Sequence, residues 1–198
     1  MYHDGNRSLQ DRFDSRRIAD RLVDVVHRTR FTDEDRAFIE TRSMFFLATA
    51  DADGRPDCSY KGGMPGFVRV VAEDELAFPS YDGNGMFKSL GNVLVNPQVG
   101  LLFLDFEHPK RLRVNGMASI DFEDPLLPGF EGAQVVVRVQ AQHIFPNCPR
   151  YIHRMALKEI SEHAPRPAHE PPVPAWKQME AFRDYLPGGA GKKDREDT

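Results

Sequence analysis

The chain has 198 residues, of which 40% are apolar and 28% charged, and its formal net charge is −4. These proportions are typical of a folded domain with appended segments, and they argue against a disordered chain and against a broadly basic nucleic-acid-binding surface. The longest apolar runs, residues 44–50 and 99–104, are strand-sized, so no membrane-spanning helix is predicted. The N-terminus lacks the apolar core of a secretory signal and two cysteines lie 90 positions apart, which favours a cytoplasmic protein with free thiols.

Two helices are predicted in an N-terminal segment, residues 1–42. Apolar residues recur at helical spacing in residues 14–30, where Ile18, Leu22 and Val25 share one face. This pattern indicates a surface helix that packs on a core or on a partner. Thr32 precedes three acidic residues and is a suitable N-cap, which predicts a second, short helix that ends near Arg42.

Residues 43–148 have the pattern of an antiparallel β-domain, because short runs rich in Phe and Val alternate with Gly, Pro, Asp and Asn. The predicted strands are residues 44–50, 56–60, 67–71, 76–78, 99–106, 111–120 and 134–145. One helix interrupts them, with Asn84 as its expected N-cap and Asn96-Pro97 as its end. Its expected apolar face carries Phe87, Leu90 and Leu94. Seven strands with one inserted helix indicate a barrel.

The C-terminal unit, residues 149–186, is predicted to consist of two helices around a stiff linker. Apolar residues at helical spacing predict the first helix over residues 149–162. Five prolines between residues 165 and 174 favour an extended linker, and Trp176 begins a last short helix that ends near Tyr185. The Gly-rich and charged residues 187–198 are predicted to form a disordered tail.

The densest run of unusual residues is SYKGGMPGFVRV, residues 59–70, between two predicted strands. Its glycines allow a ligand to approach the backbone closely, and Lys61 and Arg69 carry the charge to neutralise an anion such as a phosphate. A glycine bend at a barrel corner, with both basic side chains in solvent, explains the same residues equally well.

A second run, SYDGNGMFKSLGN, residues 80–92, contains the expected start of the inserted helix. Free backbone amides from Gly85 to Lys88 at the positive end of that helix, with the side chains of Lys88 and Ser89 one turn in, would form a phosphate cradle. Taken alone, a simple cap at Asn84 with Lys88 in solvent is the favoured interpretation. Because only a short strand joins the two runs, both can converge on one phosphorylated ligand.

Other candidate residues carry weaker signals. Arg111 and Arg113 share one face of a predicted strand, which is either a solvent-exposed edge or the wall of a site, with the edge favoured. Cys148 precedes a predicted helix that could lower its thiol pKa. A structural thiol is favoured, because a catalytic cysteine needs a histidine base that the order of residues cannot position. No metal site is predicted, since no third ligand has a suitable spacing, and no GxSxG, Walker or GxGxxG pattern is present.

Three segments taken together resemble the pyridoxamine 5'-phosphate oxidase-like, FMN-binding split-barrel family. They are MFFLATADADGRPDCSYKGGMPGFVRV, LAFPSYDGNGMFKSLGNVLVNPQVGLLF and RLRVNGMASI, and FPNCPRYIHRM is similar to the strand-to-helix exit of flavin-binding members. The resemblance covers residues 38–151. It implies a mainly β fold with flanking helices, a split Greek-key barrel of six or seven antiparallel strands. It also implies a homodimer with FMN in a groove at the subunit interface.

The resemblance further implies which residues hold the cofactor. Basic strand residues and the loop that leads into the inserted helix would bind the phosphate and ribityl chain, and two glycine amides would face the flavin ring. The strand after the NP.VGLLF hairpin would approach the flavin or the substrate. The residues assigned in this way are Lys61, Gly62, Gly63, Arg69, Ser80, Asn84, Lys88, Ser89, Asn92, Arg111 and Arg113. No catalytic residue is identified.

The resulting hypothesis is an FMN-dependent oxidoreductase that passes electrons from a small-molecule donor to an acceptor. The chain departs from true pyridoxamine phosphate oxidases, because AWKQMEAFRDYLPGG, residues 175–189, has no counterpart of their Trp-containing substrate-phosphate ending. Vitamin B6 oxidation is therefore not expected. The alternatives are a protein that carries FMN, a deazaflavin or haem without turnover, and a barrel without ligand that serves as a dimeric interaction protein.

Overall fold

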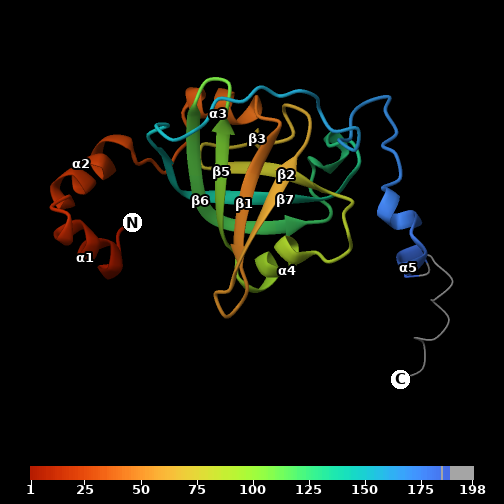
Figure 1. The fold of residues 1–198 in the computed structure, drawn as a ribbon, viewed down its shortest axis with the longest axis horizontal. Helices are drawn as coiled ribbons and strands as arrows, with labels where there is room; N and C mark the ends of the chain where they lie inside the picture. Colours follow the sequence, from red (N-terminus) through yellow and green to blue (C-terminus); the bar gives the residue numbers. More distant parts are fainter. Residues whose placement is uncertain (184, 188–198) are drawn as a thin grey trace.

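Seven antiparallel strands form one curved sheet in the computed structural model, which describes residues 1–183 and 185–187. The order of the strands across the sheet is β2-β1-β5-β6-β7-β4-β3. The sheet curls into a barrel (Figure 1), which is split because β2 and β3 stand at the two ends of the order. The strands are β1 (Met44–Ala50), β2 (Pro56–Gly62), β3 (Arg69–Val70), β4 (Glu75–Tyr81), β5 (Gln98–Asp105), β6 (Lys110–Asp121) and β7 (Ala133–Pro146).

All seven predicted strands are present, and the split-barrel fold is confirmed. The largest difference is β3, which pairs with β4 only through Arg69 and Val70. The residues before it form a turn instead, in which Gly66 has a positive φ of 88° and the Phe67 amide donates to the Met64 carbonyl over 3.0 Å. The predicted tail lies outside the described residues, apart from Pro187.

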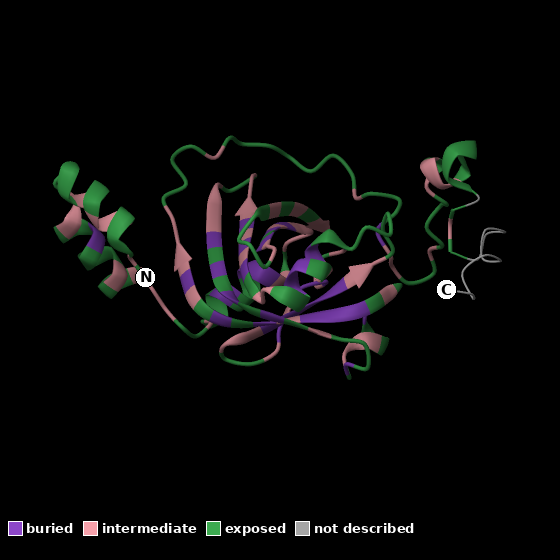
Figure 2. Cartoon of the chain, turned by 90° about the horizontal axis from the view of Figure 1, so that it is seen from below, coloured by how far each residue is buried: buried purple, intermediate pink, exposed green. Residues whose placement is uncertain are grey.

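Aromatic and branched side chains from the inward faces of the strands fill the barrel. Figure 2 colours the buried residues purple, and many of them lie on the strands. Phe45 is fully buried at the centre, and its ring centroid lies 5.0 Å from that of Phe78 and 5.2 Å from that of Phe103. The alternation of the two strand faces produces this core, because every second residue of β1 and β6 points inward.

Helix α4 (Lys88–Val95) begins three residues later than predicted, because its N-cap is Phe87 and not Asn84. The Asn84 side chain accepts from the Met86 amide over 3.0 Å, and Gly85 and Phe87 have positive φ values of 78° and 48°, so the chain is not helical before Lys88. The predicted apolar face is wrong in part, because Leu90 packs against the core whereas Phe87 and Leu94 are exposed. The residues of α4 that are buried are Ser89, Asn92 and Val93.

Three helices precede the barrel where two were predicted: α1 (Asp4–Arg12), α2 (Arg16–Val26) and α3 (Asp33–Glu40). Asp14, with a positive φ of 49°, separates α1 from α2. Helix α2 ends at Val26 because Arg28 leaves the helix and pairs with Ile144 of β7 through two backbone hydrogen bonds of 2.9 and 2.8 Å. The apolar face of α2 is open to solvent, since Ile18, Leu22 and Val25 are 57%, 49% and 59% exposed.

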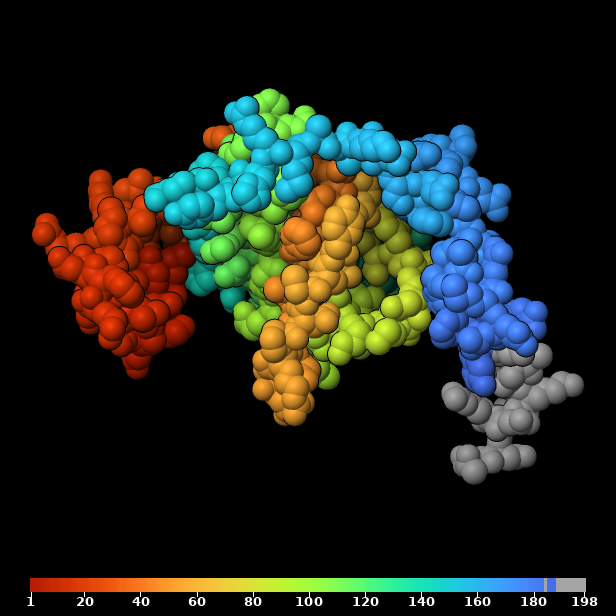
Figure 3. Space-filling view, in the orientation of Figure 1, coloured from red at the N-terminus to blue at the C-terminus, as the bar shows by residue number. Residues whose placement is uncertain are grey.

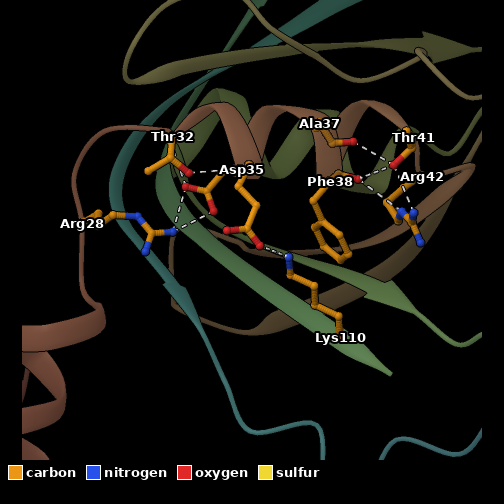
Figure 4. A network of polar contacts seen from close by, with 9 residues as sticks. Arg28, Thr32, Asp35, Ala37, Phe38, Thr41, Arg42 and Lys110 are labelled. Atoms are coloured by element: carbon orange, nitrogen blue, oxygen red, sulfur yellow. Dashed lines mark hydrogen bonds and ion pairs between the residues drawn. The ribbon is translucent and has the colours of Figure 1, made fainter. Parts of the chain in front are cut away.

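Helix α3 forms as predicted, with Thr32 as its N-cap in a capping box with Asp35. Figure 4 shows that Arg28 reaches both carboxylate oxygens of Asp35, at 2.7 and 2.8 Å. This ion pair ties the segment that joins α2 and α3 to the start of α3, next to the point where Arg28 bridges to β7.

The predicted helix over residues 149–162 is absent. Residues 152–161 have no regular secondary structure and cross the barrel as a strap (Figures 1 and 3, cyan). The Met155 amide donates to the Phe106 carbonyl over 3.1 Å, so a backbone group that a helix would use internally is committed to the barrel. Tertiary contact thus overrides the helical spacing of the apolar residues.

The predicted last helix is divided into a 3-10 turn, η2 (Ala175–Gln178), and a short helix, α5 (Glu180–Arg183). The Trp176 ring packs edge-on against Phe182, with centroids 5.9 Å apart. In the described part of the chain, none of the helices has the length and hydropathy that crossing a membrane requires.

Candidate cofactor-binding site

A cavity of about 300 Å³ lies between the edge strand β2, the loop after β4 and the first turn of α4. We call it the β2–α4 cavity. Five of the residues assigned from the sequence line it: Lys61, Ser80, Asn84, Lys88 and Ser89. The two runs that were expected to converge on one ligand therefore do meet.

Contacts between β2 and α4 hold the basic side chain in place. The Lys61 Nζ lies 3.3 Å from the Ser89 Oγ and donates to it, and the Ser59 and Ser89 hydroxyls are 3.0 Å apart. Ser59 and Lys61 are two positions apart in β2, so both side chains point to the same side of the strand, toward α4. Ser89 is buried in the first turn of α4.

The charge in this cavity is net positive, because Lys61 and Lys88 line it together with one described carboxylate, that of Asp57. Burial lowers the pKa of Lys61, although the nearby Asp57 carboxylate partly opposes the shift. No described carboxylate lies within the 4 Å of an ion pair with Lys61 or Lys88. The first α4 amide that donates within the helix is that of Gly91, to Phe87, so the amides of Lys88 and Ser89 precede the helical hydrogen bonds. Free amides at a helix start, next to an ammonium group, favour the binding of an anion.

A second cavity of about 260 Å³ adjoins the first and shares five lining residues with it: Lys61, Ser80, Tyr81, Gly83 and Leu90. It extends from this polar side toward the barrel interior, where Leu47, Phe67, Phe78 and Val137 are among the lining residues. Burial raises the pKa of Tyr81, a residue that the sequence analysis did not single out. The polar cavity thus continues into an apolar one.

Two of the predicted residues have structural roles instead. Asn92 is buried and its side-chain amide donates to the Thr49 Oγ1 over 3.0 Å, which joins α4 to β1. Arg69 donates to the Gly129 carbonyl over 2.6 Å, and its guanidinium carbon lies 4.0 Å from the centroid of the Phe130 ring. Neither residue lines the β2–α4 cavity.

The backbone amides of Gly62 and Gly63 differ in whether they already have a hydrogen-bond partner. The Gly63 amide donates to the Ser43 carbonyl over 2.9 Å, so it is not free to face a flavin ring as expected. A Cβ on Gly63 would lie 2.6 Å from the Phe67 ring, which explains the glycine by packing. Gly62 pairs with Met44 in the neighbouring register position, and antiparallel alternation turns its amide to the open edge of β2.

Arg111 and Arg113 line a different cavity, of about 640 Å³, at the end of β6 and β7. We call it the β6–β7 cavity. None of its described lining residues also lines the β2–α4 cavity. Within one chain, these arginines therefore do not join Lys61 and Ser89 at a common site.

Cys148 is expected to be a more reactive thiol than an ordinary cysteine. Hydrogen bonds from the backbone and the side chain of Arg150 lower the pKa of this thiol, and the charges of Arg150 and Arg111 contribute. A lowered pKa increases the thiolate fraction at neutral pH, and the thiolate is the nucleophile.

The Cys58→Ser variant leaves Cys148 as the one thiol that N-ethylmaleimide can label. We expect the labelling rate of this variant to reach half its maximum at a lower pH than the labelling rate of free cysteine. The additional change Arg150→Ala is expected to shift this midpoint to higher pH. An unchanged midpoint in Arg150→Ala would contradict this assignment.

Residues 31–162 match the family model for pyridoxamine 5'-phosphate oxidase. The chain belongs to this family. The match includes the whole barrel, both sides of the β2–α4 cavity and the strap. No curated protein matches the chain.

Solved structures of similar fold are distant in sequence. HupZ from Group A Streptococcus is 19% identical, with a TM-score of 0.49, over 64% of this chain and 99% of that one. HutZ, the heme storage protein from Vibrio cholerae, is 22% identical, with a TM-score of 0.44, over 59% and 94%. An FMN-binding protein from Syntrophomonas wolfei is 13% identical, with a TM-score of 0.45, over 72% and 96%. At these identities the similarity concerns the fold alone.

Sequence reasoning missed several lining residues of the site, among them Ser59, Tyr81 and the acidic Asp57. The signal for Ser59 was available, because a residue two positions before Lys61 in a strand must share its face. Tyr81 had no such signal, since its place depends on how β4 leads into the loop before α4.

Proposed function

We propose that this member of the pyridoxamine 5'-phosphate oxidase family binds FMN, with the FMN phosphate in the β2–α4 cavity, and is an FMN-dependent oxidoreductase. The observation that supports this most directly is the Lys61–Ser89 contact of 3.3 Å at the start of α4. Lys61, Ser59, Ser89, Lys88 and the first α4 amides would hold the phosphate. An ammonium group, hydroxyls and helix-start amides are donors that suit a phosphate dianion.

The chemistry of the cavity fits this cofactor. Lys61 is half-buried without an ion-pair partner in the described chain, so a bound phosphate would compensate a charge that is already partly desolvated. A volume of about 300 Å³ is at the small end for a ligand site, so the flavin ring of FMN would extend beyond it. This is consistent with a second copy of the chain that completes the site, and we propose that the protein is a homodimer located in the cytoplasm.

FMN supplies the redox chemistry when it is bound, and the protein contributes binding, orientation and electrostatics. Lys61 and the start of α4 would fix the phosphate end, while the amide of Gly62 at the open edge of β2 is available to a polar edge of the cofactor. The substrate and the electron donor are not specified by these residues.

The first test compares FMN with riboflavin, which lacks the phosphate. We expect FMN to bind at least tenfold more tightly than riboflavin in a titration that follows quenching of flavin fluorescence. Equal affinities would contradict a phosphate site in the protein. A second test is anaerobic reduction of the FMN-loaded protein by NADH or NADPH in a stopped-flow spectrometer. Failure of both donors would contradict the proposed oxidoreductase function and favour a flavin carrier.

A further inference from the structure

The N-terminal helices α1 and α2 form a unit that lies beside the barrel (Figure 1). The two helices hold each other, because the Tyr2 hydroxyl donates to the Ala19 carbonyl over 3.2 Å and Arg7 forms an ion pair with Asp20 at 2.7 Å. We call this unit, residues 1–26, the N-terminal arm. The β6–β7 cavity, of about 640 Å³, lies between the arm and the barrel. Side-chain packing alone therefore does not fix the arm to the barrel.

Two contacts directly after the arm attach it to β7. The Nε2 of His27 and the Nδ1 of His143 are hydrogen-bonded at 2.8 Å. At the next position, Arg28 and Ile144 exchange two backbone hydrogen bonds of 2.9 and 2.8 Å. Among the hydrogen bonds and ion pairs of the described residues, these are the ones that join residues 1–28 to a barrel strand.

The hydrogen bond between the two histidines depends on their protonation. One of the two facing nitrogens must carry a hydrogen and the other must be free to accept it, which is possible while at least one imidazole is neutral. When both rings are protonated, both facing nitrogens are donors. The hydrogen bond is then lost, and two positive charges lie side by side.

The groups around the histidine pair cannot compensate these charges. The titratable and charged groups that line the cavity beside the pair are the Met1 amino group, Tyr2, Arg111, Arg113 and Cys148, and no described lining residue is Asp or Glu. Acidification removes negative charge from a thiol, so Cys148 does not compensate an imidazolium at low pH. The nearby Arg28 is already paired with Asp35, at 2.7 and 2.8 Å.

We propose that the His27–His143 pair is a pH-sensitive latch, which holds the N-terminal arm on β7 at neutral pH and releases it in mild acid. Burial and the neighbouring His27 lower the pKa of His143 in the latched state, so this state binds fewer protons than the released one. Latching is therefore most favourable above the ordinary histidine pKa of about 6.5 and weakens as the pH falls below it. Release opens the β6–β7 cavity, so pH regulates access to this face of the barrel.

Hydrogen exchange measures the latch at the amides of Arg28 and Ile144, each of which donates across the bridge. The full chain is compared at about pH 7.5 and about pH 5, which lies below the ordinary pKa of histidine and above the ordinary values of carboxyl groups. Exchange rates are corrected for the intrinsic effect of pH. Each proton that the released state alone binds favours release by up to about tenfold per pH unit. We therefore expect the protection of both amides to fall at least fivefold at the lower pH.

Amides inside the barrel, in β5 and β6, provide the internal reference. Their protection should change by less than twofold between the two pH values. Unchanged protection at Arg28 and Ile144 would overturn the proposal, and so would an equal fall in β5 and β6, which would indicate general destabilisation. FMN is not added in this experiment, so its outcome is independent of the proposed function.

Variants then test the two histidines. His27→Gln and His143→Gln each place a neutral group that can donate and accept in the pair, and should reduce the change with pH to less than twofold. His3→Asn is the matched control, because it removes a histidine of the same arm that lies outside the pair and retains a suitable N-cap for α1. It should keep the full change with pH. Full pH dependence in both glutamine variants, or its loss in His3→Asn, would contradict the assignment.

Discussion

Replacing Lys61 and Lys88 together by alanine is expected to weaken FMN binding by more than tenfold and to leave the fold intact. Both side chains line the β2–α4 cavity, and Lys61 lies against Ser89 at the start of α4. A hydrogen bond to a charged group contributes about 1.5–3 kcal/mol, and a tenfold change in affinity corresponds to about 1.4 kcal/mol. The dissociation constant is measured by quenching of flavin fluorescence at fixed ionic strength, and folding by circular dichroism.

Lys158→Ala is the matched control, because it removes the same charge from an exposed position of the strap that does not line the cavity. Its FMN affinity should change by less than twofold. The double variant should also lose most of the preference for FMN over riboflavin, since only the phosphate distinguishes these ligands. If the double variant and Lys158→Ala bind FMN equally well, the phosphate does not lie in this cavity.

The largest expected effect on stability comes from Gly116→Ala. A Cβ on Gly116 would lie 2.1 Å from the carbonyl oxygen of Gln140 and 3.1 Å from the Cα of Ala141. Both atoms belong to the backbone of β7, which is paired on both sides and cannot move away without breaking hydrogen bonds. We expect a loss of about 3 kcal/mol in the free energy of unfolding. At the size of this chain, this corresponds to a decrease of about 6–12 °C in Tm by differential scanning calorimetry.

Gly100→Ala is a close control in the neighbouring strand. Gly100 pairs with Asn115, next to Gly116, but a Cβ there would lie 3.5 Å from the nearest atom, the Oδ1 of Asn115. This is ordinary van der Waals contact, so the free energy of unfolding should change by less than about 1 kcal/mol. Similar Tm values for the two variants would show that the β6–β7 contact at Gly116 can relax.

The barrel was predictable because its signals are local. Alternation of apolar residues located β1, β5, β6 and β7 to within about two residues, and Thr32 marked the start of α3 correctly. The strap over residues 152–161 was not predictable, since its apolar residues have helical spacing. The barrel surface determines its conformation through contacts such as that of Met155 with Phe106.

The candidate site was predictable in part. The basic residues and glycines of residues 59–70 and 80–92 predicted a ligand site that includes Lys61 and Ser89. In the structure, the Nζ of Lys61 lies 3.3 Å from the Oγ of Ser89. The same reasoning included Arg69 and Asn92, because residue type does not reveal a partner such as Gly129 or Thr49. The resemblance grouped Arg111 and Arg113 with the flavin site, whereas the single chain places them at another cavity.

The sequence by itself determined where the strands lie along the chain, which family the chain resembles and which two segments carry the basic residues of the candidate site. Residue type, periodicity and motif spacing are sufficient for these conclusions, because they are properties of residues close together in the sequence. Only the tertiary structure decided that α4 begins at Lys88, that Ser59 and Tyr81 join the first cavity, and that α2 forms the wall of the second. These features depend on contacts between segments far apart in the chain, and such contacts follow from packing rather than from local preference.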